Sequence, residues 1–108
     1  MPVYNKLVRD KILEIIESEG FAFNARILES SDLLKEIKAK MIEEAKEFHV
    51  ADTPNESVEE LADILELLHT ALNTIGVTYE ELDEVRLKKK EKRGGFEKAI
   101  YLIDVEDK

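Results

Sequence analysis

The stretch KMIEEAKEF, residues 40–48, has the spacing of an amphipathic helix with acidic residues beside its apolar face. Met41 and Phe48 are seven residues apart, which places them on the same face of a helix. Glu44 lies at the edge of that face, and Glu47 lies just beyond it. Like charges at this spacing weaken a helix by about 0.2–0.5 kcal/mol per pair. The pattern therefore predicts a helix whose acidic flank requires a compensating cation.

A second acidic helix is expected from EELADILEL, residues 59–67, where Glu60 and Asp63 are again three residues apart. The connecting segment VADTPNES, residues 50–57, is short and rich in turn residues, so the two helices should pack antiparallel. Glu44, Glu47, Glu60 and Asp63 would then face one another near the joined ends. Carboxylates gathered in a partly buried cleft have raised pKa values and destabilise the fold unless cations bind.

The chemistry of these side chains limits the choice of metal. All-oxygen ligands favour hard cations, so Mg²⁺ is expected, with Mn²⁺ as the alternative. A di-iron bundle would show Glu-x-x-His pairs, whereas the residues three positions after Glu44 and Glu60 are Glu47 and Asp63. The alternative interpretation is that these acids are solvated positions on an acidic protein, as we expect for Glu43. The spacing alone leaves both interpretations open.

The remaining pattern predicts a mainly α fold in a single domain, residues 1–108. Helices are expected over 7–19, over 30–49, from a cap at Asn55 or Ser57 to just before Gly76, and over 78–93. Residues 21–28 and 99–105 are richer in strand formers and are expected to pair as a small two-stranded sheet. The helix around Leu61–Ile75 has an apolar arc covering about half its circumference, wider than the stripe of roughly 100° on an ordinary surface helix. A homodimer or homotetramer is therefore expected, because one short chain cannot cover that arc.

Composition excludes several classes of function. The net charge of −9 disfavours binding to a nucleic acid polymer. The chain has no cysteine, which excludes a disulfide framework and thiolate metal ligands. No signal peptide or membrane span is expected, so the predicted location is the cytoplasm. The basic run RLKKKEKR, residues 86–93, is either a solvated helix face or a clamp for phosphate groups.

Three motifs together resemble a known group of enzymes. The segment EEAKE, followed after twelve residues by ELAD, resembles the MazG-like all-α nucleoside triphosphate pyrophosphohydrolases. The opening YNKLVRDKI (4–12) and the late KKKEKRGGF (88–96) resemble the phosphoribosyl-ATP pyrophosphohydrolase-like branch of that superfamily. The resemblance implies a MazG-like helical bundle completed by dimerisation.

The resemblance also implies roles for individual residues. It implies that the Mg²⁺ ligands and catalytic carboxylates are Glu44, Glu47, Glu60 and Asp63. It also implies that the substrate is bound by Lys89, Arg93, Lys6 and Arg9. The implied reaction is hydrolysis of a nucleoside triphosphate, or a related nucleotide, between its α and β phosphates, with removal of noncanonical or surplus nucleotides as the expected purpose. The rival expectations are a noncatalytic nucleotide- or metal-sensing module and a plain helical dimerisation protein.

Overall fold

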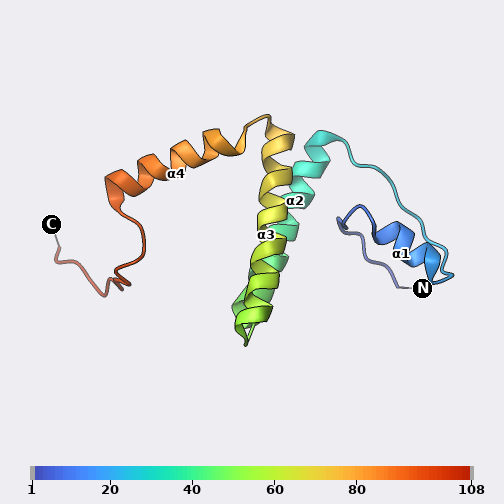
Figure 1. The fold of residues 1–108 in the computed structure, drawn as a ribbon, viewed down its shortest axis with the longest axis horizontal. Coiled ribbons are helices and arrows are strands. Elements are labelled where there is room, and N and C mark those ends of the chain that lie inside the picture. The colour runs from blue at the N-terminus through green and yellow to red at the C-terminus, as the bar shows by residue number, and fades with distance from the viewer. Residues whose placement is uncertain (1, 108) are drawn as a thin grey trace. The chain divides into compact units, whose positions relative to one another are not determined.

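The computed structural model describes residues 2–107, which contain four helices and no strand (Figure 1). They fall into two compact units, one ending at Gly76 and the other beginning at Val77. The first unit contains α1 (Ile12–Ser18), α2 (Ser30–Val50) and α3 (Pro54–Ile75), and the second contains α4 (Tyr79–Arg93). The expectation of a mainly α fold is confirmed.

The two long helices α2 and α3 pack side by side as an antiparallel hairpin (Figure 1). Thr53 caps the start of α3, because its side-chain oxygen accepts a hydrogen bond from the Glu56 N–H at 3.1 Å. Pro54 takes the first helical position, where its fixed φ fits and its missing N–H has no cost. The prediction that Asn55 or Ser57 caps this helix was therefore wrong.

The hairpin has a thin core. Ile37 of α2 is fully buried and Leu72 of α3 is 7% exposed. Other apolar side chains of α3 remain open, including Leu61 at 47% and Leu65 at 48% exposed. The apolar arc predicted from the sequence is thus left uncovered within one chain.

The N-terminal part of the first unit is less regular than predicted. The helix α1 begins at Ile12 rather than near residue 7, and it ends before Gly20, whose φ of 85° is in the left-handed region that favours glycine. The expected sheet is also wrong, because neither 21–28 nor 99–105 forms a strand. Their alternation is imperfect, and an isolated two-stranded ribbon is marginally stable in water.

The second unit consists of α4 followed by an irregular segment. The Thr78 side chain accepts a hydrogen bond from the Glu81 N–H at 3.1 Å and so caps the start of α4. Basic residues fill the last turn of α4, where the helix dipole favours positive charge. No helix within residues 2–107 combines the length and the apolar character that crossing a membrane requires.

Candidate metal centre

The helices α2 and α3 bring the predicted carboxylates into one cluster. Oxygen atoms of Glu44, Glu60 and Asp63 lie within 4.8 Å of one another, and Glu44 forms a second such group with Glu43 and Glu47. Glu44 is common to both groups, because it projects from α2 toward the acidic flank of α3. The structure therefore brings together all four carboxylates singled out in the sequence, and it adds Glu43.

Glu44 is the buried centre of this cluster, with only 6% of its surface exposed. The Oε2 atoms of Glu44 and Glu60 are buried and have no hydrogen-bond partner among residues 2–107. Leaving a buried charged oxygen without a donor has a cost of about 1–3 kcal/mol or more. Such oxygens are stabilised when a cation binds. From the sequence, Glu44 was expected at the edge of an apolar face. Its side chain is more buried than that position suggests, because α3 packs over it.

The electrostatics of the cluster show an excess of negative charge. Burial has the largest effect on Glu44 and raises its pKa to about 8, and Glu47, Glu60 and Asp63 act in the same direction. For Glu60, the interaction with Glu44 is the largest influence and lowers the pKa. Burial and the charges of Glu47 and Asp63 outweigh it, so the pKa of Glu60 is raised. At neutral pH the cluster therefore holds a proton unless a metal cation replaces it.

Two cationic side chains of the N-terminal segment reach these acids. The Arg9 Nη2 donates a hydrogen bond to Asp63 Oδ1 at 2.6 Å, and Lys6 Nζ lies 3.4 Å from Glu43 Oε1. The hydrogen bond to Asp63 is the main reason that the pKa of Arg9 is raised. Both residues were predicted to bind phosphate, and the structure places them at the edge of the carboxylate cluster.

Sequence reasoning missed a third cation, Lys40. Its Nζ lies 3.6 Å from Glu43 Oε2 and 3.8 Å from Glu44 Oε1. The signal was present, because Lys40 precedes these two acids by three and four residues, the spacings at which helix side chains meet. Lys40, which belongs to α2, therefore offsets part of the negative charge of Glu43 and Glu44.

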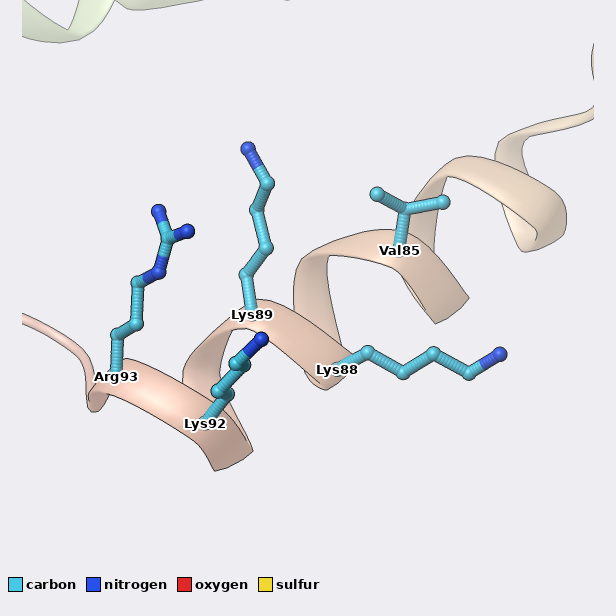
Figure 2. Close-up of a pocket in the computed structure, with 5 residues that line it drawn as sticks. All are labelled: Val85, Lys88, Lys89, Lys92 and Arg93. Atoms are coloured by element: carbon cyan, nitrogen blue, oxygen red, sulfur yellow. The ribbon is translucent and has the colours of Figure 1, made fainter.

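The predicted phosphate contacts Lys89 and Arg93 lie on α4, in the second unit. With Val85, Lys88 and Lys92 they line a pocket of about 250 Å³. Figure 2 shows Lys89 and Arg93 extending to the same side of the helix, as their spacing of four residues requires. Both side chains belong to exposed residues and present their charges to solvent. Four of the five residues that line it are positively charged, so its charge favours an anion over a metal cation.

The carboxylate cluster fits a hard divalent cation. Oxygens sharing one Mg²⁺ at about 2.1 Å are at most about 4.2 Å apart. The oxygens of Glu44, Glu60 and Asp63 all lie within 4.8 Å of one another, so sharing one ion requires at most small side-chain adjustments. All the donors are carboxylate oxygens, which disfavours soft metals.

The sequence model of the phosphoribosyl-ATP pyrophosphohydrolase family matches residues 14–90. The chain belongs to the phosphoribosyl-ATP pyrophosphohydrolase family. This family lies within the MazG-like all-α superfamily, so the resemblance seen in the motifs is confirmed. Among curated proteins and solved structures, none matches the chain.

Membership of the phosphoribosyl-ATP pyrophosphohydrolase family indicates a pyrophosphohydrolase, and the family is generally metal-dependent. The matched residues include the whole of α2 and α3, with all four predicted carboxylates, and they extend to Lys90 of α4. Arg93 lies beyond the match, as do Lys6 and Arg9. The family match therefore includes the four predicted carboxylates and Lys89, and it does not include Lys6, Arg9 or Arg93.

Proposed function

We propose that this protein is a Mg²⁺-dependent nucleotide pyrophosphohydrolase that hydrolyses a nucleoside triphosphate to a monophosphate and pyrophosphate. The observation that carries this proposal is the buried Glu44 at the centre of a carboxylate cluster, in a chain of pyrophosphohydrolase ancestry. Mn²⁺ is an alternative ion with the same preference for oxygen ligands. Removal of noncanonical or surplus nucleotides in the cytoplasm is the expected purpose.

The carboxylates would hold the metal and manage the proton of the attacking water. The ligands are Glu44, Glu47, Glu60 and Asp63. A Mg²⁺ ion held there would neutralise charge on the phosphates and lower the pKa of the attacking water. One carboxylate of the cluster accepts the proton of the water that attacks the α-phosphorus.

The basic side chains would bind the triphosphate. Lys89 and Arg93 extend to one side of α4, so both can contact the same chain of phosphates (Figure 2). Lys6 and Arg9 already lie at the carboxylate cluster and can reach a nucleotide bound there. The family match extends across the boundary between Gly76 and Val77, which supports the expectation of a single domain over residues 1–108.

Assembly into at least a homodimer belongs to this proposal. The open apolar side chains of α3, including Leu61 and Leu65, are too extensive for a stable solitary helical hairpin. Pairing two hairpins into a four-helix bundle would bury them about a two-fold axis. The carboxylate clusters would then be sheltered from water on more sides than one chain provides.

Pyrophosphate release from a panel of canonical and modified triphosphates tests the activity. The wild type should release pyrophosphate with Mg²⁺ and stop when a chelator is added. Asp63→Asn should be inactive because it removes a ligand charge without changing the volume. The matched control is Glu59→Gln, an exposed acid on the same helix, which should retain full activity. A wild type that binds Mg²⁺ and nucleotide without releasing pyrophosphate would instead be a sensing module.

A further inference from the structure

The Arg9 side chain binds a carboxylate that the candidate metal centre also requires. Its guanidinium is hydrogen-bonded to Asp63 Oδ1 at 2.6 Å, and an oxygen of Asp63 belongs to the group formed with Glu44 and Glu60. Arg9 therefore provides one positive charge at a cluster whose carboxylates repel each other. A divalent cation would provide two positive charges and contact three carboxylates at once.

The Arg9–Asp63 pair is weak enough to be exchanged. The Arg9 side chain is 59% exposed and that of Asp63 is 37% exposed, so water screens their attraction. Arg9 also precedes α1, and residues 2–9 have no regular secondary structure. A second ion pair, between Lys6 and Glu43, is similarly exposed, at 43% and 39%. The segment can therefore move its cations without unfolding either long helix.

Two roles for Arg9 make opposite predictions about metal affinity. If Arg9 stays bonded and orients Asp63, its removal should weaken metal binding, as the loss of orienting partners of metal ligands usually does. If Arg9 competes with the metal, its removal should strengthen metal binding. Repulsion favours competition, because a guanidinium in contact with Asp63 would lie close to a divalent cation on the same carboxylate.

We propose that Arg9 is an exchangeable counter-ion: it neutralises Asp63 in the metal-free protein, and Mg²⁺ takes its place there. The displaced guanidinium then binds a phosphate oxygen of the nucleotide, for which its planar set of donors is well suited. Metal binding thus precedes and assists nucleotide binding. The nucleotide step rests on the proposed function, whereas the exchange at Asp63 does not.

The first experiment measures the affinity for Mn²⁺ by calorimetry without nucleotide, for the wild type, Arg9→Ala and Arg9→Gln. The matched control is Arg26→Ala, which removes the same charge from an exposed residue that has no ion pair within residues 2–107. Both Arg9 variants should bind Mn²⁺ roughly two- to fivefold more tightly, the range expected for release of an exposed ion pair. The control should match the wild type. Unchanged or weaker binding in the Arg9 variants would overturn the proposal.

The second experiment measures binding of a nonhydrolysable triphosphate analogue at saturating Mg²⁺. The Arg9 variants should bind it roughly tenfold more weakly or worse, the scale of a lost hydrogen bond to a charged group. Arg26→Ala should not change. Opposite effects on metal and analogue are the signature of exchange, because damage to the fold would weaken both. Circular dichroism should show wild-type helix content in each variant.

The two proposals can fail separately. If the wild type releases no pyrophosphate while the Arg9 variants bind metal more tightly and the analogue more weakly, the exchange stands and the proposed hydrolysis is wrong. If the wild type hydrolyses triphosphates while the Arg9 variants keep both affinities unchanged, the hydrolysis stands and the exchange is wrong.

Discussion

Replacing Glu44 by glutamine should stabilise the metal-free protein, although it removes a metal ligand. Glu44 is 6% exposed, and its pKa is raised from 4.5 to about 8 by burial and neighbouring acids. Between these two values the folded protein binds a proton that the unfolded chain has lost. The free energy of unfolding therefore falls as the pH rises through this window. Glutamine has nearly the same volume and no charge to desolvate.

The size of the effect follows from the two pKa values. The penalty from Glu44, relative to a side chain that stays neutral, is about 1 kcal/mol at pH 5, about 3 kcal/mol at pH 7 and about 4 kcal/mol at pH 8. These are upper limits for Glu44→Gln, because the amide does not reproduce every contact of the protonated carboxyl. The gain in stability should still grow steadily with pH.

Urea unfolding in the presence of a chelator measures this gain. Wild type and Glu44→Gln are compared at pH 5 and pH 8, with Glu59→Gln as the control on the exposed surface of α3. The control should stay within about 0.5 kcal/mol of the wild type at both pH values. A Glu44→Gln protein that is no more stable than the wild type at pH 8, or a gain that does not increase with pH, would refute the reasoning about burial.

Four further predictions follow from the same cluster and its surroundings. Metal binding at pH 7 should release nearly one proton from Glu44, seen by calorimetry in buffers of different ionisation enthalpy; heats independent of the buffer would contradict this. Asp63→Asn should keep the helical circular dichroism and lose Mg²⁺-dependent turnover, so wild-type turnover would remove Asp63 from the ligands. Lys89→Ala and Arg93→Ala should each lower kcat/KM by roughly ten- to a hundredfold with metal affinity unchanged, and wild-type kinetics in both would make α4 a solvated face. Light scattering should give at least twice the chain mass of 12.4 kDa, and Leu65→Asp should reduce it; active monomers of the wild type would exclude the dimer.

Local spacing was sufficient to predict the hairpin and the meeting of its two acidic flanks, but it left open whether these acids form a metal site. Helix periodicity around Phe48 and Leu61, with a short connection between them, brings the two acidic flanks together whatever the details of packing. The cap at Thr78 was also predictable, because Glu81 follows at the spacing of a capping box. The start of α3 was not predictable in this way, because several polar residues before it could serve as the N-cap. Pro54 occupies the first helical position, which makes Thr53 the cap.

Contacts between distant residues were beyond any spacing rule. Arg9 and Asp63 are 54 positions apart, and no pattern in the sequence relates them. The burial of Glu44 likewise depends on α3, so the helical wheel of α2 alone placed this side chain too far out. The strand predicted over residues 21–28 was wrong because only local β propensity supported it. That propensity has little effect where no neighbouring strand is present to pair with.

The most direct test of the central claim is phosphorus NMR of a triphosphate incubated with the protein and Mg²⁺ in water enriched in heavy oxygen. Attack on the α-phosphorus predicts equal amounts of monophosphate and pyrophosphate, with the heavy oxygen in the monophosphate alone. Both products should disappear when a chelator is added or when Asp63 is replaced by asparagine. Formation of diphosphate and orthophosphate, or an unchanged triphosphate with every nucleotide tried, would contradict the account.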